Sequence, residues 1–148
     1  MHPDEGFKNF DILYKEFSET QLKLNEANTR AKIIDRFLKE CLGWPESALT
    51  REDRNDAGYT DYQLLMNTRA QIIIEAKKTG EYFEIPRAQY RRHFKVGGVL
   101  QSIPNLASAL NQARNYSLEI GCKYAAVFNG YLKWSPKTGQ VVKIEFCS

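Results

Sequence analysis

The chain of 148 residues contains little of what several common chemistries need. Its two histidines and three cysteines show neither CxxC nor zinc-finger spacing, so we do not expect a structural zinc site. No Ser/His/Asp or Cys/His arrangement indicates nucleophilic catalysis, and no GxxxxGK(S/T) motif indicates a nucleotide-driven motor. The formal net charge of +3 permits a nucleic-acid partner without requiring one.

Long apolar runs are also missing. They fall far short of the roughly 20 residues that a membrane helix needs, and no export signal opens the chain. With an odd number of cysteines and no such signal, we expect free thiols in a cytoplasmic protein with no membrane partner. A hydrophobic fraction of 43% is enough for a folded core, and the length fits one domain over residues 1–148.

Helical periodicity dominates the first part of the chain, over Phe7–Glu19 and Asn25–Leu42. The second helix has Asn25 as its expected N-cap. Its predicted apolar stripe consists of Ala27, Ala31, Ile34, Phe37, Leu38 and Cys41. We interpret residues 1–24 as an N-terminal helical extension and residues 25–148 as the core of the domain.

Strand-like runs follow, interrupted by one more helix that begins at Pro104 and ends at Gly121. The expected strands are Ala48–Arg51, Gly58–Met66, Ala70–Lys78, Lys123–Phe128, Tyr131–Trp134 and Val141–Phe146. Thr79–Ser102 fits neither pattern. This order of elements predicts an α/β fold with a central mixed β-sheet flanked by helices.

The candidate chemistry lies in Asp61 and in the run Glu75-Ala76-Lys77. If Asn67–Arg69 form a three-residue turn, Met66 pairs with Ala70, and Asp61 then lies opposite Glu75 with Lys77 on the same face. The opposite face would carry a core of Leu64, Met66, Ile72, Ile74 and Ala76. A slip of one residue would separate the two carboxylates, so the inference depends on the turn.

Two carboxylates and a lysine are suited to metal-dependent phosphodiester hydrolysis. Mg²⁺ prefers carboxylate oxygens, and a nearby lysine can orient water or offset charge on the phosphate. Adjacent carboxylates repel by roughly 3 kcal/mol at an effective dielectric constant of about 20, which a divalent ion would offset. The alternative is a cross-strand polar cluster on a solvated face, with Lys77 as the counter-ion.

Four blocks of sequence, in order, resemble the N-terminal nuclease domain of type I restriction enzyme R subunits and related prokaryotic defence proteins. They are Asn25–Arg30 with the closing Leu42–Trp44, Gly58–Tyr62, Ile74–Lys78, and the QxxxY motif Gln112–Tyr116, with Val127–Gly130 beyond. Together they span residues 25 to 134. The resemblance implies a PD-(D/E)xK restriction-endonuclease-like fold.

The resemblance also implies roles for individual residues. Asp61 and Glu75 would bind Mg²⁺, with Mn²⁺ as a substitute, and Lys77 would serve the attacking water or the scissile phosphate. Glu26 would complete the metal shell from the helix; its alternative is a first-turn glutamate that interacts with the helix dipole. Gln112 would contact the DNA backbone or support the site.

Contacts with DNA are expected from residues outside the metal shell. The candidates are Lys78, Arg87, Arg91, Arg92 and Tyr116. The segment Glu81–Lys95, rich in arginine and aromatic residues, is typical of a flap that contacts phosphates. Its alternatives are a solvated loop or a hairpin that pairs with another domain, and the alternative for Tyr116 is a half-packed residue on a polar helix face.

The sequence therefore predicts a metal-dependent endodeoxyribonuclease domain in a restriction or anti-phage defence system. The alternatives are a catalytically silent, nuclease-like binding or assembly module of a larger defence protein, and activity on RNA or a nucleotide. DNA is the expected partner, and a fused or separate ATPase or sensor domain and a second copy of the chain are further candidates. We expect the chain to be the N-terminal part of a larger protein, with a small complete protein as the alternative.

Overall fold

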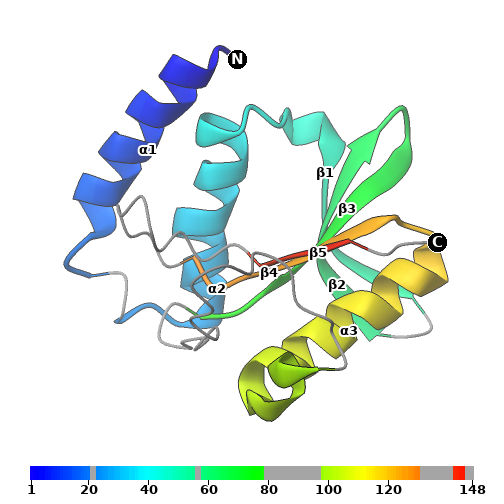
Figure 1. Ribbon diagram of the computed structural model, residues 1–148. Coiled ribbons are helices and arrows are strands. Elements are labelled where there is room, and N and C mark those ends of the chain that lie inside the picture. The colour runs from blue at the N-terminus through cyan, green and yellow to red at the C-terminus, as the bar shows by residue number, and fades with distance from the viewer. Residues whose placement is uncertain (21–22, 56–57, 79–97, 131–141, 146–148) are drawn as a thin grey trace.

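A mixed five-stranded sheet, in the order β1-β2-β3-β4-β5, organises the computed structural model (Figure 1). The structure describes residues 1–20, 23–55, 58–78, 98–130 and 142–145. The strands are β1 (Leu49–Asn55), β2 (Gly58–Met66), β3 (Arg69–Ala76), β4 (Tyr124–Phe128) and β5 (Val142–Glu145). The helices are α1 (Pro3–Phe17), α2 (Glu26–Thr29), η2 (Arg30–Ile34), η3 (Phe37–Cys41), η4 (Glu46–Ala48), η5 (Val99–Ser102) and α3 (Pro104–Ile120).

The connections between strands explain why the sheet is mixed. Strands β1, β2 and β3 form an antiparallel meander, and β3 pairs in parallel with β4 after a crossover that contains α3. Strand β5 then returns antiparallel to β4, where a strand over Val141–Phe146 was expected. The α/β class and the mixed sheet are confirmed. The expected strand over residues 131–134 lies outside the described residues.

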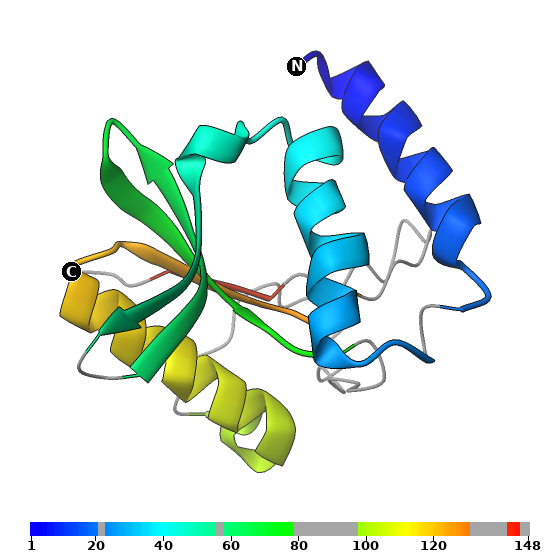
Figure 2. The same ribbon diagram turned by 180° about the vertical axis from the view of Figure 1, so that it is seen from behind.

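Helices cover both faces of the sheet (Figures 1 and 2). Helix α3 packs on the face that carries Ile73, where Leu106, Leu110 and Val127 are buried with it. The continuous helix formed by α2, η2 and η3 packs on the other face, in a core that includes Ile34, Leu38, Tyr62, Leu64, Ile74 and Phe128. Alternate residues of β3 therefore point into different cores, as strand geometry requires. Within the described residues, no helix is long and apolar enough to cross a membrane.

Helix α1 forms a further layer outside the long helix. Leu13 and Phe17 pack on Ile33, and a Cβ atom at Gly6 would collide with the carbonyl group of Cys41. The first turn of α1 therefore lies beside the C-terminal end of η3. Figure 2 shows the two helices running in opposite directions, so the beginning of α1 is remote from the beginning of α2.

The long helix begins as predicted, and four of the six residues of its predicted stripe pack in the core: Ile34 and Leu38 are buried, and Phe37 and Cys41 are partly buried. The side chain of Asn25 accepts a hydrogen bond from the Asn28 amide at 2.8 Å, which confirms the N-cap. The prediction for Ala27 and Ala31 was wrong, because both are exposed and Thr29 is buried instead. The physical reason is the π-helical segment η2, whose wider turn changes which residues share a face.

The β2–β3 hairpin also departs from its predicted geometry near the turn. Its turn has two residues, Asn67 and Thr68, both at positive φ, and Met66 pairs with Arg69 instead of Ala70. An irregularity at Leu64/Leu65 then shifts the register by one residue, so Tyr62 pairs with Ile74 as the predicted register requires. Met66, predicted to be in the core, is 57% exposed because it lies beside the exposed turn.

Candidate active site

Asp61 lies where β2 separates from β3, one residue beyond the Tyr62–Ile74 pair. Its Oδ2 atom accepts a hydrogen bond from the Ala76 amide at 2.7 Å. The side chain of Asp61 thus takes the place of a backbone carbonyl group on the neighbouring strand. Glu75 precedes that amide on β3, and Lys77 follows it. The three residues come together as the sequence predicts, and we call them the carboxylate site.

Glu75 is the most buried member of the carboxylate site. Its side chain is 3% exposed, and its Oε1 atom accepts a hydrogen bond from Lys77 Nζ at 2.7 Å. Its Oε2 atom is also buried and has no hydrogen-bond partner within the described part of the chain. Buried polar atoms are almost always paired, so this oxygen is a position where a cation or a water molecule would be stabilising.

The electrostatics of the site disfavour negative charge in the metal-free protein. Burial raises the pKa of Glu75 to about 7, against the opposing hydrogen bond from Lys77 and with added repulsion from Asp61. Burial also raises the pKa of Asp61, although the Ala76 amide and Arg30 oppose it. Burial alone would lower the pKa of Lys77, but its partnership with Glu75 outweighs this and the pKa is raised. The site would therefore be stabilised by an added positive charge.

Glu26 faces the carboxylate site from the first turn of α2. Its side chain is exposed, and its charge raises the pKa of Asp61, of Glu75 and of Lys77. Within the described ranges, no three His, Cys, Asp or Glu side chains are close enough to form a metal site by themselves. Mg²⁺ commonly uses one or two carboxylates and completes its shell with water and substrate phosphate, so Asp61 and Glu75 are a suitable donor set.

The QxxxY residues form a pair of their own on α3. Gln112 Nε2 donates a hydrogen bond to the Tyr116 hydroxyl at 3.2 Å, and Tyr116 is 5% exposed. A Cβ atom at Gly58 would come within 2.8 Å of that hydroxyl, so the pair contacts the start of β2, the strand that carries Asp61. Among the described residues, neither side chain hydrogen-bonds to the carboxylate site. Their geometry favours support of β2 over direct contact with DNA.

The candidate DNA-binding residues are only partly described. Lys78 is exposed and directly follows the carboxylate site. Arg87, Arg91 and Arg92 lie outside the described residues, as does the whole segment Glu81–Lys95. The flap therefore stays a prediction.

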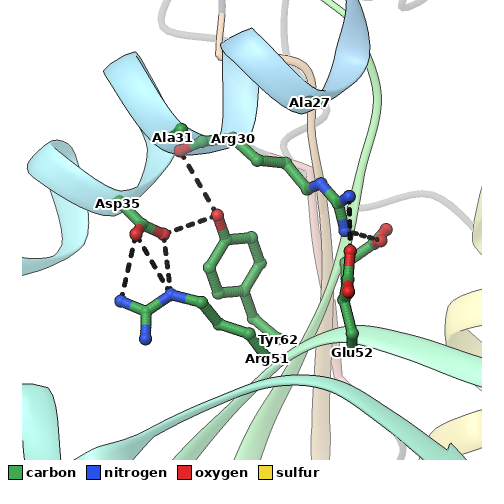
Figure 3. Close-up of a pocket in the computed structure, with 8 residues that line it drawn as sticks. Ala27, Arg30, Ala31, Asp35, Arg51, Glu52 and Tyr62 are labelled. Carbon is green, nitrogen blue, oxygen red and sulfur yellow. Dashed lines mark hydrogen bonds and ion pairs between the residues drawn. The ribbon is translucent and has the colours of Figure 1, made fainter.

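Sequence reasoning missed Arg30, which bridges the carboxylate site to β1 (Figure 3). Its Nη1 atom lies 3.0 Å from Asp61 Oδ1, and its Nη2 atom lies 2.7 Å from Glu52 Oε1. The helical spacing from Glu26 to Arg30 could have indicated a shared face, since residues four apart are neighbours on a helix. Nothing in the sequence singles out Glu52.

A second group of ion pairs lies beside the contacts of Arg30. It consists of Arg51, Asp35, Glu46 and Lys39, and we call it the Arg51 network. Arg51 pairs with Asp35 at 3.0 Å and with Glu46 at 2.6 Å, and Lys39 pairs with Glu46 at 3.1 Å. Tyr62 donates its hydroxyl hydrogen to Asp35 at 2.7 Å. Arg30, Glu52 and Asp61 line one open pocket of about 280 Å³ together with Asp35 and Arg51, and Ala27, Ala31 and Tyr62 complete its lining.

Comparison of the chain with protein-family models, characterised proteins and solved structures gave no match.

Proposed function

We propose that this chain is a nuclease domain of the PD-(D/E)xK type, which hydrolyses DNA phosphodiester bonds with Mg²⁺ or Mn²⁺ in a restriction or anti-phage defence system. The observation that carries the proposal is the buried Oε2 atom of Glu75, which has no hydrogen-bond partner among the described residues and lies in the same site as Asp61 and Lys77. The choice of DNA and the defence setting depend on the resemblance in sequence. The mixed sheet flanked by helices is compatible with the proposed fold.

Asp61 and Glu75 would hold the metal ion, with Glu26 adding negative potential from the helix. A bound divalent ion supplies polarisation of the phosphate and lowers the pKa of a water ligand. Both carboxylates sit at the end of the β2–β3 pairing and are fixed by backbone and lysine contacts, which limits their reorganisation. Neutralisation of their mutual repulsion would favour binding of the cation.

Lys77 would act as a donor in this site. Its raised pKa keeps it protonated at neutral pH, so it can hold a water molecule or a phosphate oxygen by a charged hydrogen bond but is a poor base. Its hydrogen bond to Glu75 fixes its position. Gln112 and Tyr116 would act indirectly, by holding the start of β2 in place.

One observation favours the binding-module alternative. Both oxygens of Asp61 already accept hydrogen bonds, from Ala76 and from Arg30. An aspartate whose two oxygens are both engaged within the protein would suit a nuclease-like domain that binds nucleic acid or assembles with a partner without cutting.

Plasmid cleavage separates the two functions. Wild type, Lys77→Ala and the control Lys15→Ala are incubated with supercoiled DNA in Mg²⁺, Mn²⁺ or EDTA; Lys15 is an exposed lysine of α1, paired with Asp11. We expect metal-dependent nicking by wild type and by Lys15→Ala, and its loss in Lys77→Ala. Parallel assays on RNA and nucleotides identify the substrate. Folded wild type that cuts none of these would reject the nuclease and favour the binding module.

A further inference from the structure

Arg30 lies between two carboxylates that are held very differently. Asp61 is 16% exposed and is also fixed by the Ala76 amide. Glu52 is 63% exposed, and its hydrogen bond to Arg30 holds it at the edge of the pocket. Exposed ion pairs are weak and readily exchanged, so Glu52 is the replaceable partner of Arg30.

The backbone of Glu52 has an unusual conformation at this contact. Its φ angle is 52°, in the left-handed region that residues other than glycine rarely adopt. The β1–β2 ladder pairs Arg51 with Tyr62 and Asp53 with Thr60, and Glu52 and Asp61 lie between those pairs. Glu52 thus combines a strained backbone with a position opposite Asp61, where it contacts Arg30. Strained residues of this kind occur often at ligand sites.

The space around Arg30 is open to a ligand. Ala27 and Ala31 present only methyl groups to the pocket on either side of Arg30 in the helix, and both are exposed (Figure 3). A guanidinium group carries five donors in a planar fork that suits phosphate oxygens. A phosphate that replaced Glu52 on Arg30 would lie next to Asp61, where phosphodiester hydrolysis needs it.

We propose that Arg30 binds a nucleic-acid phosphate beside the Asp61 carboxylate, and that Glu52 occupies the place of this phosphate in the substrate-free protein. The inference rests on the proposed function and adds to it a substrate-binding residue and an internal competitor. Arg30 keeps its contact with Asp61 through Nη1, while Nη2 exchanges the Glu52 carboxylate for the phosphate.

The test measures binding of a short fluorescent DNA duplex by anisotropy, at low salt and with Ca²⁺. Glu52→Gln should lower Kd by roughly 3- to 5-fold, because the competitor loses its charge while the change in free energy stays near that of one exposed ion pair. The matched control is Glu5→Gln, which removes the same charge from the first turn of α1, remote from Arg30. It should leave Kd within twofold of wild type.

The double variant shows whether the effect passes through Arg30. Arg30→Gln should weaken binding, and adding Glu52→Gln to it should give no further gain. Arg30→Lys, which keeps the charge without the fork, should recover part of the affinity, and thermal unfolding checks that each variant is folded. An unchanged Kd in Glu52→Gln, a gain that persists without Arg30, or no DNA binding by either wild type or Glu52→Gln would overturn the proposal.

Cleavage of the same DNA in Mg²⁺ separates this inference from the proposed function. Cutting by wild type with no dependence of Kd on Glu52 would reject the phosphate site and keep the nuclease. The expected Kd changes without any cutting would keep the phosphate site and reject the nuclease.

Discussion

The ion pairs of Arg30 and those of Arg51 lie side by side along one pocket. The two groups differ in the balance of positive and negative charge. In the Arg51 network, two cations face two carboxylates, and each carboxylate is paired. Around the carboxylate site, the described residues include two cations, Arg30 and Lys77, and four carboxylates, those of Glu26, Glu52, Asp61 and Glu75. Similar residues thus form a neutral structural link in one place and an electronegative site in the other.

This contrast in charge balance separates structural ion pairs from functional ones. Perturbed pKa values occur in both networks, so a perturbed pKa alone does not identify a functional site. What distinguishes the carboxylate site is an excess of negative charge among the described residues, together with a buried Glu75 oxygen that has no hydrogen-bond partner among them. A bound cation would offset the negative charge and would pair with the buried oxygen. In the Arg51 network the charges are already balanced.

The largest expected difference is in catalysis. Asp61 and Asp35 are matched aspartates, 16% and 19% exposed, and each is paired with an arginine. Asp61→Asn should lower the rate of plasmid nicking in Mg²⁺ by at least about 100-fold, because it removes a proposed metal ligand. Asp35→Asn should cut at a rate close to wild type. Equal nicking rates in the two variants would contradict the assignment of Asp61 as a metal ligand and of Asp35 as a structural residue.

The next difference is in stability, and it has the opposite order. Arg51→Ala leaves the half-buried Asp35 without its cation and should lower the free energy of unfolding by about 2–3 kcal/mol. Lys77→Ala should lower it by less than about 1 kcal/mol, because Glu75 can become neutral near pH 7. Urea denaturation at pH 7 in EDTA measures both. A larger loss in Lys77→Ala would contradict the assignment of structural and functional roles.

The smallest difference concerns pH, where the networks should respond with opposite sign. The pKa of Glu75 is raised from 4.5 to about 7, so its contribution to stability is present below pH 4.5 and lost as pH rises toward 7. The pKa of Glu46 is lowered to about 2 by Arg51 and Lys39, so its contribution is present above pH 4.5 and lost as pH falls toward 2.

Chemical denaturation in EDTA across this range tests the signs. A full shift at Glu75 corresponds to at most about 3 kcal/mol, and relaxation of the carboxylate toward water should reduce it to about 1–2 kcal/mol. Wild type should lose this stability relative to Glu75→Gln as pH rises from 4.5 to 7. Glu46→Gln should be less stable than wild type above pH 4.5, and this difference should disappear as pH falls toward 2. A pH profile for Glu75→Gln parallel to that of wild type would show that Glu75 is not the buried titrating group.

The sequence was sufficient to predict which carboxylates meet, although for an incomplete reason. Asp61 and Glu75 come together because the hairpin register is correct at the site, while the predicted turn was one residue too long. The irregularity at Leu64/Leu65 compensates for the shorter turn. Side-chain alternation predicts faces well, but turn length and bulges depend on local backbone geometry that residue patterns encode weakly.

Other parts of the site could not be predicted from periodicity. The π-helical segment η2 changes the helix phase, so Ala27 and Ala31 line the pocket instead of the core. The approach of Glu52 to Arg30 depends on a left-handed residue within a strand, which no sequence pattern here indicates. By contrast, the limits of α3 followed directly from Pro104 and from Gly121, which ends the helix at φ 71°.

Binding of a divalent cation is expected at the carboxylate site and not at the Arg51 network. Calorimetric titration of Mn²⁺ into metal-free wild type, Glu75→Gln and Glu46→Gln tests it without depending on any substrate. We expect wild type and Glu46→Gln to bind Mn²⁺ with equal affinity, and Glu75→Gln to bind it about 10- to 100-fold more weakly. Equal affinity in all three proteins, or no binding to folded wild type, would contradict it.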